Sequence, residues 1–259
     1  MDQLKISHYE KIESYLPVDL LTGGNFFKAF IVVYAFIIIR YALSVYPFYL
    51  YFWKINSQKK SYLHKGNFSK KQIQNEIYYS ILSSLIFTLA GIIMGVLWQQ
   101  GYTKIYLKID TYSYLYLPLS FILISLLHEV YFYFTHRWMH LKSVFKHVHH
   151  IHHLSINTSP WASFSFHPFE AFILAAFLPL AVIILPIHPI ILITYMMFMT
   201  LSAISNHLGV ELIRSTAITR YFISGTHHAL HHQYFKSNYG LYYCFMDRLF
   251  QTENTKREI

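Results

Sequence analysis

Long apolar stretches separated by short polar segments form the main pattern along this 259-residue chain. The stretch 77–97 runs for 21 residues without a charged side chain. A helix of that length matches the hydrocarbon core of a bilayer, which is about 30 Å thick. Four more stretches are similarly apolar: 29–53, 112–127, 169–187 and 190–206. The pattern predicts an all-α integral membrane bundle with about four or five spans or hairpins. A soluble all-α protein with buried core helices fits the length of 77–97 poorly.

The third apolar stretch predicts a helix that is longer than the membrane is thick. It continues smoothly into the following residues, giving a helix from Tyr114 to His140 that is about 40 Å long. The C-terminal end of this helix must therefore project beyond the hydrocarbon into a helical cap. The last two stretches are shorter and are joined by the proline-rich turn 186–189, which predicts a tight hairpin.

Composition divides the chain into three parts. Residues 1–25 are polar and of mixed charge, with no secretory signal pattern. Residues 26–111 hold the first two apolar stretches and the loop between them, and residues 112–259 hold fifteen of the 17 histidines. We expect an N-terminal segment, an N-terminal transmembrane region and a domain that carries the chemistry, in that order.

Basic residues predict how the bundle is oriented in the membrane. The loop 54–76 carries one acid, Glu76, against six lysines: Lys54, Lys59, Lys60, Lys65, Lys70 and Lys71. Such a density of positive charge beside a span marks the cytosolic side. The loop 98–111 is less basic and should face outward. Counting spans onward places the residues from 136 and those beyond 206 on the cytosolic side, with the turn 186–189 outside.

Charge and cysteine content narrow the chemistry that the chain can perform. The chain is 54% apolar and 13% charged, with a net charge of +9. Its lysines bracket membrane spans rather than line a groove, so no nucleic-acid partner is expected. A single cysteine, Cys244, excludes an internal disulfide, a cysteine-rich zinc module and an iron–sulfur cluster. Any bound metal must therefore be held by nitrogen or oxygen.

Three groups of histidines have the spacing of metal ligands. They are an HxxxH (His136, His140), an HxxHH (His149, His152, His153) and a second HxxHH (His228, His231, His232). Residues three or four apart share one face of a helix, which lets their imidazoles converge on one ion. Eight converging imidazoles are more than one tetrahedral ion can use, so the spacing predicts two metal ions. Imidazole suits iron, zinc and copper alike.

A few more ionisable residues are candidates for the same site. His207 follows the fifth apolar stretch and is a candidate ligand, whereas Glu211 is a weaker one. Glu129 lies on the helical face of His136 and is interpreted as its outer hydrogen-bond partner, with an ion pair to Arg40 as the alternative. The remaining histidines are assigned by position. His167 is an outer donor or a loop residue; His147, His150 and His227 are solvent-side or outer residues; His8, His64 and His188 have no metal role.

These motifs resemble the fatty acid hydroxylase/sterol desaturase superfamily of membrane di-iron enzymes. The similarity covers roughly 114–251 and lies in HEVYFYFTHRWMH, KHVHHIHHLSINTSPWASFSFHP, NHLGVE and GTHHALHHQYFKSNYGLYYCFMDRLF. The last segment is most similar to bacterial members. Family members often have aspartate at the position of Glu129. The resemblance implies ligand roles for His136, His140, His149, His152, His153, His228, His231 and His232, and a further one for His207.

The resemblance also implies a reaction and its partners. It implies O₂-dependent hydroxylation or desaturation of a membrane lipid C–H bond at two iron ions, for which zinc could substitute in a purified sample. Residues 112–259 would form the catalytic domain, on the cytosolic side of a bacterial inner membrane. The chain has no dinucleotide fingerprint, so a ferredoxin or cytochrome b5-like protein is the expected electron donor. The donor would dock on a surface formed by six cations, which could equally well serve to bind lipid headgroups. They are Arg137, Lys142, Lys146, Arg214, Arg220 and Lys236.

Several alternatives stay open at this point. Aromatic residues near the histidines either line a substrate tunnel or anchor the membrane interface: Trp138, Trp161, Phe164 and Phe166. A non-catalytic metal-binding or transport protein is a second class of function, but 77–97 and 190–204 lack the ionisable residues that an ion path requires. A structural membrane protein with stabilising metals is a third. The sequence leaves open the choice between hydroxylation and desaturation, the lipid class and the oligomeric state.

Overall fold

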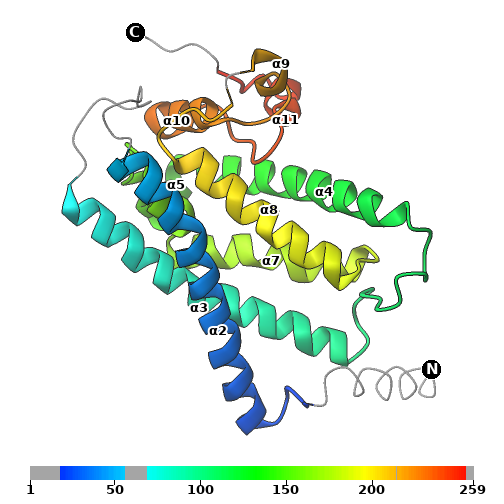
Figure 1. The fold of residues 1–259 in the computed structure, drawn as a ribbon. Coiled ribbons are helices and arrows are strands. Elements are labelled where there is room, and N and C mark those ends of the chain that lie inside the picture. The colour runs from blue at the N-terminus through cyan, green and yellow to red at the C-terminus, as the bar shows by residue number, and fades with distance from the viewer. Residues whose placement is uncertain (1–17, 56–68, 214, 255–259) are drawn as a thin grey trace.

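The computed structural model describes residues 18–55, 69–213 and 215–254, which form helices and connecting loops without a β-strand. Four helical segments are long and apolar enough to cross a membrane. They are α2 (Gly23–Tyr49) with its π-helical extension η1 (Leu50–Ile55), α3 (Lys70–Gln99), α4 (Tyr116–Met139) and α8 (Pro189–His207). A shorter apolar helix, α7 (Pro168–Ile184), packs mainly against α3 and leads through a turn into α8 (Figure 1). The predicted all-α membrane bundle is confirmed.

The helix boundaries follow from local sequence. Helix α4, which was predicted to span 114–140, begins and ends within two residues of these limits. Helices α7 and α8 both begin with proline, whose missing N–H is no loss in the first turn. Each is capped by the preceding histidine: His167 Nδ1 accepts from Phe169 N at 3.3 Å, and His188 Nδ1 accepts from Ile190 N at 3.2 Å. The predicted hairpin is therefore two capped helices joined by a short turn.

Short helices complete the chain at one end of the bundle. They are α5 (Lys142–Val148), α6 (His150–His153), the 3₁₀ turn η3 (Pro160–Phe164), α9 (Thr216–Thr219), α10 (Gly225–Tyr234) and α11 (Phe245–Leu249). Figure 1 shows α9, α10 and α11 gathered beyond the C-terminal end of α8. They form the helical cap that the length of the third helix predicts.

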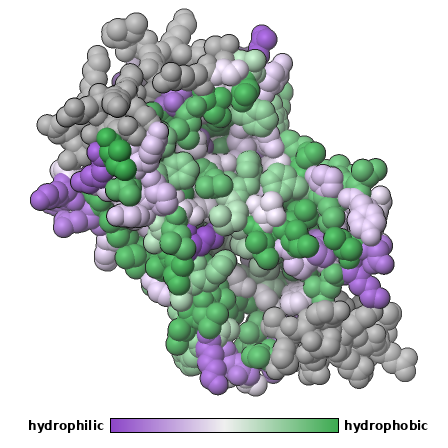
Figure 2. Space-filling model, viewed as in Figure 1, coloured by the Kyte–Doolittle hydropathy of each residue, from purple (hydrophilic) through white to green (hydrophobic). Residues whose placement is uncertain are grey.

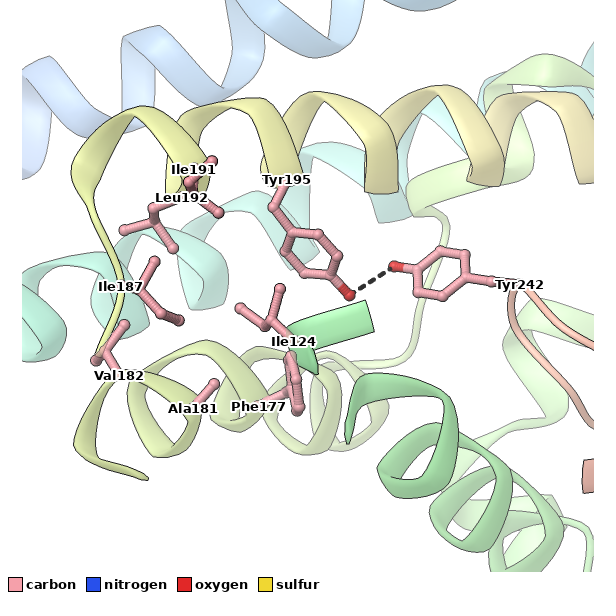
Figure 3. Close-up of a cluster of buried hydrophobic side chains, with 9 residues drawn as sticks. All are labelled: Ile124, Phe177, Ala181, Val182, Ile187, Ile191, Leu192, Tyr195 and Tyr242. Atoms are coloured by element: carbon pink, nitrogen blue, oxygen red, sulfur yellow. Dashed lines mark hydrogen bonds between the residues drawn. The ribbon is translucent and has the colours of Figure 1, made fainter. Parts of the chain in front are cut away.

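Apolar side chains cover the outside of the bundle as well as its core. Phe27, Ile31 and Leu43 on α2 each expose about two thirds of their surface, and Figure 2 shows hydrophobic residues across much of the visible face. Such a surface matches lipid rather than water. The largest buried cluster lies between α4, α7 and α8 (Figure 3), and there Tyr195 donates its hydroxyl proton to the hydroxyl of Tyr242 at 3.3 Å.

Contacts at both ends of the bundle agree with the predicted topology. At the end away from the cap, Tyr106 N donates to Ile187 O at 3.3 Å, so the loop 98–111 meets the hairpin turn. At the cap end, Trp53 Nε1 donates to Leu208 O at 3.0 Å and Gln72 Nε2 donates to Asn157 O at 2.7 Å. Both described edges of the lysine-rich segment therefore lie on the side of the cap, whereas Lys59, Lys60 and Lys65 fall outside the described residues.

Candidate metal centre

Nine histidines from four parts of the chain meet where the cap joins the membrane helices. Their ring nitrogens form two groups, and within each group the candidate ligand atoms all lie within 4.8 Å of one another. The first group is His136, His140, His149, His153 and His231; the second is His152, His207, His228 and His232. Of the nine, eight are buried and His140 is partly exposed. The structure thus brings together every histidine that the sequence predicts as a ligand; the ligand role itself stays a prediction.

The helical spacing of the motifs explains part of this convergence. His149 and His153 are one turn apart, and their Nε2 atoms lie 3.1 Å apart. His228 and His232 repeat the arrangement on α10, with Nε2 atoms 3.0 Å apart. Residues at this spacing lie on one helical face. Histidines that are adjacent in the sequence point in different directions from the helix. His153 therefore belongs to the first group and His152 to the second.

Hydrogen bonds fix which ring nitrogen is free to bind a cation. The Nδ1 atoms of four histidines contact backbone carbonyl oxygens: His136 with Tyr239, His152 with Ser165, His207 with Ala203 and His231 with Ser237, at 2.7–3.1 Å. A carbonyl oxygen only accepts, so each of these Nδ1 atoms must carry the ring proton. Their Nε2 atoms therefore present lone pairs to the interior of the cluster.

The free nitrogens face one another too closely for a site that holds only protein. His207 Nε2 and His152 Nε2 lie 3.2 Å apart although neither carries a proton. Two lone pairs at this separation repel, and a cation between them would remove the repulsion. Nitrogens about 2.1 Å from one ion and at right angles to each other are about 3.0 Å apart. The spacings of 2.9–3.2 Å within both groups fit that arrangement.

Burial keeps the imidazoles of the cap in the neutral form that binds metal. It lowers the pKa of His231 to about 4 and that of His140 to about 2, and in His140 the neighbouring imidazoles of His231 and His152 lower it further. The pKa values of His149 and His228 also lie well below the ordinary histidine value, because both rings are buried beside other imidazoles. At neutral pH these rings are uncharged and can act as ligands.

Glu170, at the start of α7, is a site residue that the sequence analysis missed. Its Oε1 lies 2.7 Å from His149 Nδ1, and both side chains are buried. A carboxylate bound to the outer nitrogen of a ligating histidine fixes the ring and raises its basicity. Glu170 is the only acidic residue between 168 and 207, so an isolated charge in an apolar helix was the signal that could have found it.

Replacing Glu170 by glutamine is expected to lower metal affinity by about tenfold to a hundredfold, because His149 loses its anionic partner. The measurement is metal retained per chain after dialysis against graded chelator concentrations. Glu211→Gln is the control, since Glu211 Oε2 accepts from Thr226 N at 2.9 Å and lies in neither histidine group. Equal retention by Glu170→Gln and the wild type would contradict this role.

Glu129 does not contact the histidines, so the prediction that it is the outer partner of His136 is wrong. Its carboxylate accepts from the backbone N–H groups of Leu241, Tyr242 and Tyr243 at 2.7–3.2 Å. The chain returns over α4 at this point, which the helical face of Glu129 alone could not reveal. The alternative ion pair with Arg40 is not formed either, because the guanidinium binds α8.

Glu129 and Asp247 instead hold the loop that supports His136. Asp247 accepts from Tyr239 N and Gly240 N, both at 2.8 Å, and Tyr239 O accepts from His136 Nδ1. A Cβ on Gly240 would lie 2.9 Å from both carboxylates and 2.8 Å from a backbone oxygen, so only glycine fits here. Two buried acids thus fix the backbone that orients one histidine.

Replacing Glu129 by alanine is expected to destabilise the protein by about 2–4 kcal/mol, because three buried or partly buried N–H donors lose their acceptor. Thermal unfolding in detergent, compared with the unfolding of Glu129→Asp and of the exposed-site variant Lys146→Ala, measures the loss. An unfolding temperature within one degree of the wild type for Glu129→Ala would contradict the assigned contact.

The other candidate residues lie outside both groups. His147 and His150 are exposed, as predicted, and His167 and His188 are helix caps. His227 is buried, with Nε2 3.3 Å from Glu253 Oε1 and 3.8 Å from Cys244 Sγ, and Arg248 also binds Glu253. His8, His64 and Arg214 fall outside the described residues.

An apolar cavity of about 330 Å³ lies in the membrane region below the histidines. Its wall is built by α2, α3, α4, α7, α8 and the turn η3. Two of its lining side chains contact the histidine groups: the ring centroid of Phe166 is 5.0 Å from that of His152, and that of Phe132 is 4.8 Å from that of His136. The cavity therefore borders both groups. Of the four aromatic residues for which tunnel lining and interface anchoring were both open, Phe164 and Phe166 line this cavity, whereas Trp161 packs against Tyr41 and Trp138 is exposed.

Fold and site together define a helical integral membrane protein with a buried histidine cluster that can hold metal. Residues 121–252 match the fatty acid hydroxylase family, and the chain belongs to that family. No solved structure is significantly similar to the chain.

Curated relatives carry the names of sterol-modifying enzymes. The chain is 30% identical to a Delta(7)-sterol 5(6)-desaturase of Gibberella zeae, over 71% of this chain and 57% of the relative. It is 29% identical to the lathosterol oxidases of Rattus norvegicus (73% and 64%) and Homo sapiens (70% and 61%). The chain thus spans less than two thirds of the length of these three relatives.

Proposed function

We propose that this protein is an oxidoreductase that oxidises a C–H bond of a membrane lipid, using O₂ and two iron ions held by the nine histidines. The observation that carries the proposal is the pair of histidine groups whose facing Nε2 atoms lie 2.9–3.2 Å apart. The names of the relatives, sterol desaturase and lathosterol oxidase, support a lipid substrate. Whether the product is a hydroxylated or a desaturated lipid is left to the experiment below.

The histidines and their hydrogen-bond partners would divide the work of holding the metal. Five imidazoles would bind one ion and four would bind the other, and zinc could replace iron in a purified sample. When bound, the two irons would supply electrons that reduce and split O₂, and the oxidising power released is what an unactivated C–H bond requires. The backbone carbonyls on the Nδ1 atoms and the carboxylate of Glu170 hold the rings in place. The cavity below the cluster would shelter the lipid from water.

Electrons would come from a separate ferredoxin or cytochrome b5-like protein. Five of the six cations predicted to steer it are described, and all five are exposed on the cap or at the adjoining end of α4: Arg137, Lys142, Lys146, Arg220 and Lys236. A positive surface of this kind attracts an acidic carrier at a rate that falls with ionic strength. We further propose that the cap faces the cytosol, since the lysine-rich segment adjoins it, and that the membrane is a bacterial inner membrane, as the resemblance noted for the C-terminal motif implies. Residues 112–259 would form the catalytic domain.

Comparative lipidomics of a deletion strain tests the proposed function. The strain is rescued with a plasmid that encodes either the wild-type protein or His152→Ala. Only the wild-type plasmid should restore a lipid that differs from its precursor by one oxygen atom or by two hydrogen atoms, and the mass difference identifies the reaction. Identical lipid profiles for all three strains, with both proteins expressed, would contradict the proposal.

A further inference from the structure

Arg40 is a cation in the middle of a membrane helix, on the wall of the cavity. Its Nη1 donates to Met196 O at 3.0 Å and to Thr200 Oγ1 at 2.5 Å, and its guanidinium lies 5.7 Å from the centroid of the Phe164 ring. None of the ion pairs among the described residues includes Arg40. A charged side chain at this depth without an acidic partner is costly, which makes it a candidate binding residue.

The guanidinium has a donor left over. Arg40 Nε is buried and has no hydrogen-bond partner within the described part of the chain. No other cavity-lining residue has such an atom in the described ranges. The His128 ring, which also lines the cavity, stacks on Phe177, and its Nδ1 is already bonded to the hydroxyls of Tyr195 and Tyr242. The cavity is thus an apolar space whose wall carries a guanidinium with an unpaired Nε–H donor.

The position of Arg40 relative to the histidines sets the length of a ligand that could reach both. Its partner Thr200 lies seven residues before His207 on α8, a rise of about 10 Å. Ala203, between them, lines the cavity and supplies the carbonyl that accepts from His207 Nδ1. A lipid whose oxygen sits at the guanidinium can therefore extend through apolar space toward the histidines.

We propose that Arg40 binds the oxygen-bearing group of an otherwise apolar lipid and so selects and orients the substrate. The inference rests on the proposed function for the statement that the bound lipid is the substrate. The ligand needs an acceptor oxygen at one end and an apolar body of at least about 10 Å. A carboxylate would neutralise the charge of the guanidinium and accept a hydrogen bond from its Nε–H. A hydroxyl would accept the hydrogen bond without neutralising the charge, and a hydrocarbon would do neither.

Binding of three fluorescent polyenes of equal length tests the proposal without any reaction. The probes are cis-parinaric acid, the corresponding alcohol and the corresponding hydrocarbon, added to the protein in lipid nanodiscs and followed by energy transfer from tryptophan. Affinity is expressed per mole fraction of probe in the lipid, which removes differences in partitioning. The acid should bind the wild-type protein at least about tenfold tighter than the hydrocarbon, with the alcohol between them. Equal affinities for the three probes would overturn the proposal.

Variants assign the preference to the guanidinium. Arg40→Met should abolish the discrimination and leave hydrocarbon binding within about twofold of the wild type. Arg40→Lys should keep a preference for the acid over the alcohol, because it keeps the charge. Arg220→Met, at an exposed position on the cap, is the matched control and should bind all three probes as the wild type does. Full discrimination in a folded Arg40→Met protein would contradict the proposal, and should that variant not fold, the wild-type ranking decides alone.

The same probes separate this inference from the proposed function. The probe ranking should persist in His152→Ala, because Arg40 does not contact the histidines. If the protein holds no metal and oxidises no lipid but still ranks the probes, the proposed function fails and the Arg40 site stands as a lipid-binding site. If it oxidises a lipid and does not rank the probes, only the Arg40 site fails.

Discussion

Replacement of His152 by alanine is expected to lower lipid oxidation by at least about a hundredfold while the chain stays folded. His152 has a lone pair on Nε2 aimed at the second histidine group, and its Nδ1 is held by Ser165 O at 3.1 Å. Loss of an outer partner of a metal ligand already costs about tenfold to a hundredfold. Loss of one of only four candidate ligands of an ion should cost at least as much.

The matched control for this variant lies two residues away. His150→Ala removes an exposed imidazole from the same short helix and should leave turnover and metal content unchanged. The measurement is product formed per chain by the purified proteins, with metal content and helical circular dichroism determined on the same samples. Unchanged turnover in His152→Ala would show that the histidine cluster is not the reaction centre.

Removal of the metal is expected to lower the unfolding temperature of the purified protein by about 10 °C. A ligand present at a thousand times its dissociation constant stabilises the folded state by about 4 kcal/mol, and one kcal/mol corresponds to about 2–4 °C at this chain length. Without cations, the facing lone pairs of His152 and His207 at 3.2 Å also repel. Both effects act in the same direction.

The measurement compares unfolding before and after treatment with a chelator, and again after iron is added back. The shift should reverse with iron, and in His152→Ala it should be smaller because one group has lost a ligand. A chelated protein that has lost its metal but unfolds at the same temperature would show that the two groups do not depend on cations for their stability.

Sequence periodicity was sufficient to predict the membrane helices and which residues could meet on one face. The one-turn spacing of His149 with His153 and of His228 with His232 determines that each pair converges, and the structure has both pairs within about 3 Å. The length of the predicted helix 114–140 likewise required that it extend past the membrane. These are properties of a single helix, which is why the sequence was enough.

Features that depend on how separate elements pack could not be derived in this way. Glu170 contacts His149, which lies 21 residues earlier in the chain, because α7 packs against α5. Glu129 has the right helical face but meets the returning segment 241–243 instead of His136, since a helical face does not reveal what covers it. Glu76 was counted as a charge in a loop, yet it is buried on α3 and accepts from Ser155 and Ser159, which fixes the segment after α6.

The central claim is that the nine histidines hold two metal ions, and iron analysis of the full-length protein tests it most directly. Protein purified from iron-supplemented cells is analysed for metal per chain and by X-ray absorption at the iron edge. We expect two irons per chain, with nitrogen neighbours at about 2.1 Å and no sulfur. Protein that contains no transition metal under these conditions, or iron bound through sulfur, would contradict it.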